Sequence, residues 1–257
     1  ILLDNMLRSR IIPVLLVRNN GLVKTLNFSN DVYVGDPLNA VRIFNEKNSD
    51  ELVILDIDAS AKKNKPNFSL ISNWAAECRM PLCYGGGITN KDDALKILSL
   101  GVEKISISSS AVKNPALINE IASLAGSQSV VVTIDIKKKF LKGYKIFTGN
   151  GIIQHDIDLL DYLKIVQDHG AGEIVINNID RDGTMKGYDL DLLDYIKDNI
   201  NIPLTFLGGC GSIKDISELT KSYYPIGAGA GSLFVFKGKY KAVLINYPSK
   251  NEIKDIL

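Results

Sequence analysis

Short, continuously apolar segments rich in β-branched residues recur along the chain, with amphipathic stretches between them. The apolar segments are residues 11–17, 52–57, 81–84, 104–108, 130–134, 173–177, 203–207 and 226–230. Continuous rather than alternating hydrophobicity is typical of parallel strands that are buried on both faces. Amphipathic segments at residues 37–45, 92–100, 115–125, 157–169 and 190–199 predict helices between the strands.

Eight strand–helix units in 257 residues come to about 32 residues per unit, which is typical of an α/β protein with a (β/α)8 TIM barrel. A doubly wound sheet would alternate in the same way, but no GxGxxG motif follows the first strand. We therefore predict one barrel domain over residues 1–257.

The second half of the sequence repeats landmarks of the first half at an almost constant offset. YGGGI at 84–88 matches LGGCG at 207–211, Asp58 matches Asp182, and Ser109 matches Ser232. These offsets are about 123 positions, and the ends of the first and fifth strands correspond at an offset of about 119. The register predicts two duplicated half-barrels, at about residues 6–125 and 126–240.

Composition and charge exclude several classes of function. The chain has 30 basic and 29 acidic residues, a net charge of +1, and no clustered basic face, so we expect no nucleic-acid partner. The lysine-rich stretches at 62–65 and 137–139 are interpreted as solvated loops. No apolar run approaches the ~18 residues of a membrane span, and no secretory signal begins the chain. We therefore expect no membrane partner.

The cysteines and histidines predict neither disulfides nor a metal site. The three cysteines, Cys78, Cys83 and Cys210, are dispersed and form no CxxC pair, which favours a reducing cytoplasm. His155 and His169 do not end strands, and we expect His169 at the C-terminus of a helix. No cofactor is expected. Met6 is a candidate natural start, with residues 1–5 as an upstream addition.

Glycines and serines gather where the predicted strands end, which is where barrel enzymes carry their chemistry. They lie at residues 85–87, 108–110, 182–183, 208–209 and 231–232. Such residues allow backbone N–H groups and hydroxyls to approach an anion. Because the pattern occurs in both halves, it predicts two phosphate sites and an elongated, doubly phosphorylated ligand. The alternative is that these glycines only form tight turns.

Aspartates at the strand ends are candidates for acid–base chemistry. They are Asp56, Asp58, Asp135, Asp180 and Asp182. Asp135 is the first choice for a catalytic residue because it ends an all-apolar strand and is expected to point into the barrel mouth. A capping or structural role is the alternative, particularly for Asp56 and Asp180.

Four charged residues stand at the entrances of predicted strands, at the opposite end of the barrel. They are Arg10, Glu51, Lys104 and Glu173. Buried charges around one axis are costly unless they pair with one another. From the residues alone, this set is an ionic plug that stabilises the barrel.

Motifs along almost the whole chain resemble those of the HisF family, the cyclase subunits of imidazole-glycerol-phosphate synthase in histidine biosynthesis. They include RSRIIPVLLV, DELVILDIDAS, YGGGI, GVEKISISSSAV, GSQSVVVTIDI and GAGEIVINNIDRDGTMKGYD. The resemblance implies a half-barrel duplication and a HisH-like glutaminase docked on the N-terminal face of the barrel. It further implies that ammonia passes a gate formed by Arg10, Glu51, Lys104 and Glu173.

The resemblance also assigns roles at the mouth. It implies phosphate binding by Gly87, Ser109, Asp182, Gly183, Gly209, Gly231 and Ser232. It implies an acid–base role for Asp135. Lys24, in the long first loop, matches the family's mobile-loop lysine and is expected to reach over the substrate; the alternative for an exposed loop lysine is a solvated side chain.

One departure concerns the chemistry directly. The family uses a second aspartate at the end of the first strand, in CLDV, where this chain has Leu16 in PVLLV. Leucine cannot transfer a proton, and loss of a general acid or base costs about 10²–10⁴-fold in rate. Ser108 also stands where the family has asparagine.

PVLLV, LVKT, GDPLNA and SLFVFKGKYKAVLINYP resemble instead a paralogue group, AglZ/WbuZ-like, from surface-polysaccharide gene clusters. That resemblance implies ammonia supply for an acetamidino sugar, together with a HisH-like glutaminase and an N-sugar amidotransferase. The alternatives are a true cyclase of histidine biosynthesis and a non-catalytic ammonia conduit. A HisA-like sugar-phosphate isomerase is disfavoured, because it too requires an aspartate at position 16.

Overall fold

Eight parallel strands form a closed barrel in the computed structural model, which describes residues 8–254. Neighbours follow the order β10, β11, β12, β1, β4, β5, β6, β7, and pairing of β7 with β10 closes the ring. The barrel strands are β1 (Arg10–Arg18), β4 (Leu52–Asp56), β5 (Leu82–Gly85), β6 (Lys104–Ile107), β7 (Val130–Lys139), β10 (Glu173–Asn178), β11 (Leu204–Leu207) and β12 (Gly227–Ala230). The predicted (β/α)8 barrel is confirmed.

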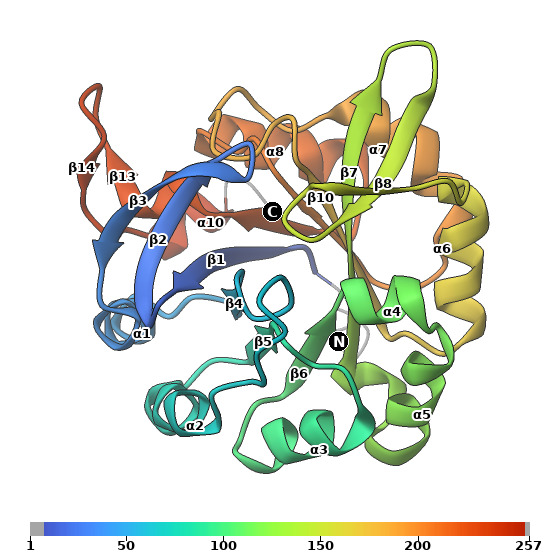
Figure 1. The fold of residues 1–257 in the computed structure, drawn as a ribbon. Coiled ribbons are helices and arrows are strands. Elements are labelled where there is room, and N and C mark those ends of the chain that lie inside the picture. The colour runs from blue at the N-terminus through green and yellow to red at the C-terminus, as the bar shows by residue number, and fades with distance from the viewer. Residues whose placement is uncertain (1–7, 255–257) are drawn as a thin grey trace, which may run out of the picture.

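Helices surround this barrel, as Figure 1 shows in a view along its axis. They are α1 (Pro37–Glu46), α2 (Phe68–Glu77), α3 (Lys91–Ser99), α4 (Ser109–Lys113), α5 (Ala116–Ala125), α6 (Leu159–Asp168), α7 (Leu190–Ile196), α8 (Ile213–Ser222), α9 (Ser232–Val235) and α10 (Lys250–Lys254), with short 3₁₀ turns at Ser127–Ser129 and Lys197–Asn199. Polar side chains cap six of them at the N-terminus: Asp36, Asn67, Asn90, Asp158, Asp189 and Ser212. Each accepts a backbone N–H that would otherwise have no partner.

Three hairpin-like additions extend from the ring. β2 (Gly21–Leu26) and β3 (Ser29–Gly35) continue from β1, β8 (Gly143–Thr148) and β9 (Ile153–His155) continue from β7, and β13 (Phe236–Lys237) pairs with β14 (Ala242–Val243). The sequence pattern predicts only a long loop for the first of these. Most of β3 is exposed, so the segment lacks the apolar signal that marks the barrel strands.

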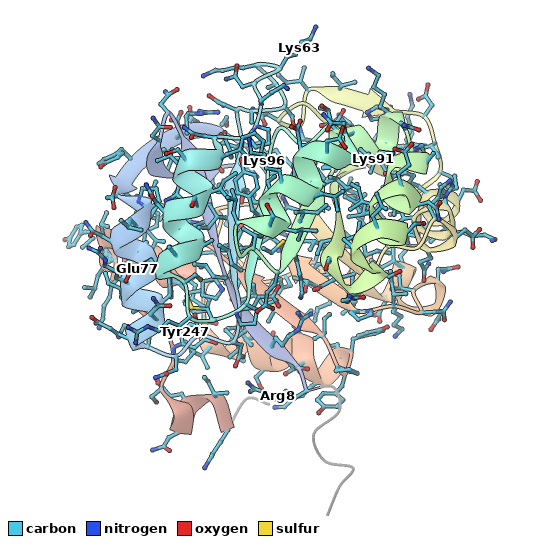
Figure 2. All side chains as sticks on the ribbon, turned by 90° about the horizontal axis from the view of Figure 1, so that it is seen from below. Arg8, Lys63, Glu77, Lys91, Lys96 and Tyr247 are labelled. Atoms are coloured by element: carbon cyan, nitrogen blue, oxygen red, sulfur yellow. The ribbon has the colours of Figure 1, made fainter. Side chains whose placement is uncertain are left out.

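Two apolar layers hold the barrel together. A large cluster fills the space between the outer face of the strands and the helices. A smaller cluster lies inside the ring and contains Val14, Cys83, Val131, Val175 and Leu207. Figure 2, turned by 90°, places Lys63, from the loop after β4, and Arg8, which precedes β1, at opposite ends of the molecule.

The described residues also bear on the expectations about membranes and termini. Between residues 8 and 254, no helix combines the length and the apolarity needed to cross a bilayer. Met6 and residues 1–5 lie outside the described part of the chain.

Candidate functional site

A cavity of about 140 Å³ opens at the carboxyl ends of the barrel strands. Its walls come from both halves of the chain, and they include most of the residues that the sequence places at the mouth. Barrel enzymes bind substrates at this end. The cavity is therefore the candidate active site.

Asp135 lies in this cavity, at the end of the apolar part of β7. The Asn177 amide donates a hydrogen bond of 2.9 Å to its Oδ1. Burial raises the pKa of Asp135 to about 7, an effect that the Asn177 hydrogen bond opposes and the charge of Asp182 reinforces. A carboxyl group with this pKa can both accept and donate a proton near neutral pH.

An apolar wall also lines the cavity. It is formed by Leu16 of β1, Leu55 of β4 and Leu207 of β11. Leu16 is half-buried and pairs with Leu55 in the parallel register of β1 and β4. The chain thus places one titratable carboxyl and one aliphatic side chain where the resemblance implies two carboxyls.

Lys24 is buried in strand β2 and points into the cavity, which corrects the expectation of a mobile-loop lysine. Its ammonium group donates a 2.7 Å hydrogen bond to the Val14 carbonyl. A Cβ atom added at Gly231 would collide with Lys24 Nζ, so any larger residue there would require the end of the lysine side chain to move. Burial lowers the pKa of Lys24 to about 8, although the charge of Asp182 acts in the opposite direction.

Asp182 and Gly183 line the cavity and also hold the β2–β3 hairpin against the barrel. The Thr25 hydroxyl donates a 2.7 Å hydrogen bond to Asp182 Oδ2. A Cβ at Gly183, which has a φ of +69°, would approach the Thr25 carbonyl oxygen to 2.1 Å, so this position requires glycine. Burial raises the pKa of Asp182, and the Thr25 hydrogen bond and Lys24 oppose that shift.

The glycine and serine set lies largely where the sequence predicts it. Ser109 and Ser232 begin the short helices α4 and α9, and both line the cavity together with Gly209 and Gly231. Gly87 is the exception, because the cavity is lined by the two preceding glycines at residues 85 and 86. The Gly87 N–H instead donates to the Ser60 hydroxyl at 3.3 Å.

The remaining aspartates have structural partners. Asp58 forms ion pairs with Arg18 (2.9 Å) and Lys62 (2.6 Å), and despite burial these cations lower its pKa. Asp56 accepts backbone N–H groups of its own loop. Asp180 accepts the backbone N–H of Lys138 at 2.8 Å. These contacts agree with a capping or structural role, although Asp56 also lines the cavity.

The two histidines lie outside the cavity lining. His169 follows α6 as its C-terminal cap, where the sequence places it, and its ring nitrogen lies 2.8 Å from the Ile165 carbonyl. His155 contacts the Thr148 hydroxyl at 2.8 Å. Within residues 8–254, no three or more His, Cys, Asp or Glu side chains are arranged to hold a metal ion.

At the opposite end of the barrel, the four charges form a closed ring of ion pairs. Arg10 contacts Glu51 at 2.5 Å and Glu173 at 2.7 Å. Lys104 contacts the same two carboxylates at 3.0 and 2.8 Å. The two glutamates are almost fully buried, and the two cations retain 25% and 18% side-chain exposure, so the ring is open to solvent only through its cations.

A second, narrower cavity of about 20 Å³ lies inside the barrel, between the ring and the mouth. At one end it touches Glu51 and Glu173. It shares five lining residues with the mouth cavity: Val14, Leu55, Ser106, Thr133 and Leu207. Its volume is just enough for one water-sized molecule.

Several lining residues were missed by sequence reasoning. Arg18, Ser106, Thr133 and Asn177 face the barrel interior within strands that are otherwise apolar. Ser106 and Thr133 lie with their hydroxyls 2.7 Å apart, at the junction of the two cavities. The sequence does mark these residues, because each is a polar residue at one of the alternate strand positions that face the barrel interior. A scan restricted to the ends of strands does not detect them.

Comparisons with known proteins agree with this architecture. The family model described as "Histidine biosynthesis protein" matches residues 10–241. The chain is 55% identical to "Putative imidazole glycerol phosphate synthase subunit hisF3" of Vibrio vulnificus, over 98% of this chain and 97% of that protein. It is 39% identical to "Imidazole glycerol phosphate synthase subunit HisF" of Clostridium botulinum, over 95% and 97% of the two chains.

A third relative has a similar relationship to the chain. "Putative imidazole glycerol phosphate synthase subunit hisF2" of Pseudomonas aeruginosa is 49% identical over 96% of this chain and 99% of that protein. The matches cover nearly the full length of each relative and include every barrel strand. The chain belongs to the HisF family of histidine biosynthesis proteins.

Proposed function

We propose that this chain is the ammonia-using subunit of a glutamine amidotransferase complex, in which it adds ammonia to a phosphorylated acceptor bound at the barrel mouth. The observation that carries the proposal is the narrow interior cavity, which touches the charged ring at one end and shares its walls with the Asp135 cavity at the other. A barrel that acted only at its mouth would need no such space.

The walls of the interior cavity favour ammonia over ammonium. Val53, Val131 and Val175 line it together with the shared residues. An ion would lose its hydration among these aliphatic side chains, at a large free-energy cost. Neutral ammonia is small enough for a space of about 20 Å³, and the hydroxyls of Ser106 and Thr133 offer hydrogen bonds where the cavities meet.

The charged ring is proposed as the gate through which ammonia enters. Each carboxylate is shared by both cations, so a cation that swings toward solvent leaves both carboxylates partly neutralised by the other cation. Arg10 and Lys104 have the more exposed side chains. This face is also the proposed docking site of a HisH-like glutaminase, which would supply ammonia directly to the ring.

At the mouth, Asp135 is proposed to move protons while ammonia attacks an electrophilic carbon of the acceptor. Its carboxylate accepts a proton from the attacking nitrogen and returns it to the leaving group, as its pKa of about 7 permits. Lys24 provides positive charge next to Gly231 and Ser232. Gly209, Ser109, Gly183 and Asp182 complete the proposed phosphate sites, with Gly86 a better candidate than Gly87 on the geometry of the cavity.

The proposed acceptor is an activated sugar nucleotide or an intermediate of an N-sugar amidotransferase in acetamidino-sugar synthesis. Leu16 supports this assignment, because it removes a proton-transfer group from the wall of the cavity where cyclisation of the histidine precursor would use one. The names of the relatives favour a second candidate, the cyclase of imidazole-glycerol-phosphate synthase. Leu16 also favours a third, a conduit that only passes ammonia.

The test is turnover of the histidine precursor, the bisphosphorylated formimino-aminoimidazole-carboxamide ribonucleotide, with excess ammonium salt. Free ammonium bypasses the glutaminase, so the assay reports the barrel alone. We expect no turnover by the wild type and measurable turnover by Leu16→Asp. Leu16→Asn is the matched control, because asparagine is similar to aspartate in size and polarity, but its amide does not act as a general acid or base.

Turnover by the wild type would establish the cyclase and overturn the proposed acceptor. If neither the wild type nor Leu16→Asp shows turnover, and calorimetry detects no binding of the bisphosphorylated ligand, the proposal of an enzyme would be overturned. The ammonia conduit would then remain. Binding without turnover in the wild type, together with rescue by the aspartate alone, is the result that supports the proposal.

A further inference from the structure

Positive charge is concentrated in two short hairpins of the chain. Residues 137–145, KKKFLKGYK, and residues 236–243, FKGKYKAV, contain eight lysines and no acidic residue. Since the whole chain has a net charge of only +1, its remaining residues carry a net charge of −7, with 22 basic and 29 acidic residues. From the sequence alone, residues 137–139 are interpreted as a solvated loop.

The structure places large apolar side chains at the tips of both hairpins. Phe140 and Leu141, between β7 and β8, are each 90% exposed, and Tyr240, between β13 and β14, is 91% exposed. Leu141 has a φ of +60°, a conformation that bulky residues rarely adopt. The hairpin therefore holds an apolar side chain outward, at a conformational cost, where glycine or asparagine would be easier to accommodate.

Among the described residues, the lysines around these tips have no carboxylate partner that would compete with an anionic surface. Lys138 lies over the ring of Tyr144 and Lys139 over the ring of Phe147, with distances of 5.2 and 5.1 Å to the ring centroids. In the described part of the chain, no carboxylate forms an ion pair with the lysines of either hairpin. Their positive charge is not neutralised within the protein.

Both hairpins extend in the same direction. In Figure 1 the β7–β8 hairpin and the β13–β14 hairpin start from different sides of the barrel, and both tips rise toward the upper edge of the picture. One flat surface can therefore meet both tips. A lipid bilayer is flat, carries anionic headgroups and has an apolar layer beneath them, and so complements the geometry, the lysines and the apolar tips together.

We propose that the two hairpins attach the protein to the surface of a bilayer that contains anionic lipids. Phe140, Leu141 and Tyr240 enter the headgroup region, and the flanking lysines contact lipid phosphates. A nucleic acid would complement the cations and the aromatic rings but offers little to Leu141. Because β7 also carries Asp135, attachment would hold the candidate active site close to the membrane surface.

The experiment uses the full chain and sedimented vesicles of phosphatidylcholine, either alone or with one quarter phosphatidylglycerol, in 0.1 M salt. We expect binding to the anionic vesicles and not to the neutral ones. Lys138→Gln and Lys139→Gln should each lower the partition coefficient about fivefold, the equivalent of about 1 kcal/mol per lysine. Phe140→Ser with Leu141→Ser should lower it about tenfold or more, because the apolar anchor is lost.

Matched controls lie on helices outside the two hairpins. Leu124→Ser in α5 removes an apolar side chain that is 60% exposed, and Lys164→Gln in α6 removes an exposed lysine; neither should change binding. Phe140→Trp gives a direct reading of insertion, because its emission should shift to the blue on anionic vesicles while Trp74, which is buried, stays constant.

Three results would overturn the proposal. They are absence of binding to anionic vesicles, equal binding by the wild type and the Phe140→Ser, Leu141→Ser variant, and no spectral shift of Phe140→Trp. Tighter binding of the hairpins to poly(U) RNA or to an acidic protein than to anionic vesicles would also overturn it and assign the surface to that class of partner.

Discussion

Both ends of the barrel contain charged side chains that are largely removed from solvent, but the two ends differ in the number of oppositely charged partners. At the N-terminal end, Glu51 and Glu173 each contact both cations of the ring within 3.0 Å. At the mouth, Asp135 has a single amide donor, and the Lys24 ammonium donates only to a carbonyl. Asp135 is half-buried, whereas Glu51 and Glu173 are buried, so the number of charged partners, and not deeper burial, makes the difference.

The difference appears in the pKa values. Burial raises the pKa of Glu173, but Arg10 and Lys104 lower it more, so this carboxylate stays ionised. Its neighbour Glu51 has the same two cations, but burial and the charge of Glu173 outweigh them and raise its pKa. Asp135 has no cation to offset its burial and has a pKa of about 7, while burial brings the pKa of Lys24 down to about 8. The charge of Glu173 is fixed by its two cations, which suits a gate, whereas Asp135 and Lys24 titrate near neutral pH and suit proton transfer.

The largest effect is expected from Asp135→Asn at the mouth. The amide keeps the shape of the side chain but cannot accept a proton, so turnover should fall about 10²–10⁴-fold. Affinity for the bisphosphorylated ligand should stay within about threefold, since the substitution leaves the glycines and serines in place. Turnover is measured with ammonium salt and the histidine precursor, and Asp135→Asn is introduced into the background that converts this precursor, either the wild type or Leu16→Asp. Calorimetry measures the affinity for the bisphosphorylated ligand.

Folding provides the control for this variant. The pKa of Asp135 is raised above its ordinary value, so its contribution to the free energy of unfolding is favourable at low pH and is lost as the pH rises from about 4 to about 7. Above pH 7, Asp135→Asn should therefore be at least as stable as the wild type. A fully active variant would remove Asp135 from the mechanism.

The charged ring should respond to Glu173→Ala through stability. The substitution leaves Arg10 and Lys104 with one carboxylate and deprives the Thr205 hydroxyl of its acceptor at 2.6 Å. Removing one partner of a buried ion pair costs about 3–5 kcal/mol, and we expect about 3 kcal/mol because the two cations are partly exposed. Urea denaturation measures this loss.

The matched control is Glu218→Ala, which removes an exposed carboxylate 3.4 Å from Lys214. Its effect should lie within about 0.5 kcal/mol of zero. If Glu173→Ala cost no more than this control, water would be solvating the ring cations, and the contrast between the two ends of the barrel would be lost.

Much of the fold could be predicted because the barrel strands have a simple signature. Segments such as 130–134 are apolar at every position except Thr133, and all eight predicted segments are barrel strands in the structure. The β2–β3 hairpin carries no such signature: Asn27, Phe28 and Asn30 have positive φ values, and most of β3 faces solvent. Its strands are held by contacts with Asp182 and Ile179, more than 150 positions away in the sequence, which no local pattern can show.

The site could be predicted in its chemistry but not in its contacts. Asp135 and the glycine turns stand at strand ends, so barrel geometry alone brings them together. The burial of Lys24 could not be foreseen, because its ammonium group lies beside Gly231, in the opposite half of the chain. Likewise, three successive glycines at 85–87 gave no means to decide which of them lines the cavity.

The smallest expected effect, and the sharpest probe of the mouth, comes from Asn177→Ala. Asn177 supplies the hydrogen bond that holds the pKa of Asp135 down against burial. Without this donor the pKa should rise from about 7 by about one to two further units, since a hydrogen bond to a charged group contributes about 1.5–3 kcal/mol and one pKa unit corresponds to about 1.36 kcal/mol. The midpoint is measured from the carboxyl ¹³C shift of Asp135 during a pH titration.

Asn39→Ala, at an exposed position of α1, serves as the control and should leave that midpoint unchanged. A shift in Asn177→Ala would mean that one neutral donor lowers the pKa of Asp135 against burial, as the two cations of the ring do more strongly for Glu173. An unchanged midpoint would mean that water replaces the amide and that the Asp135 carboxyl is better solvated than its place in the cavity indicates. In that case the contrast between the two ends would depend on solvent access rather than on the number of partners.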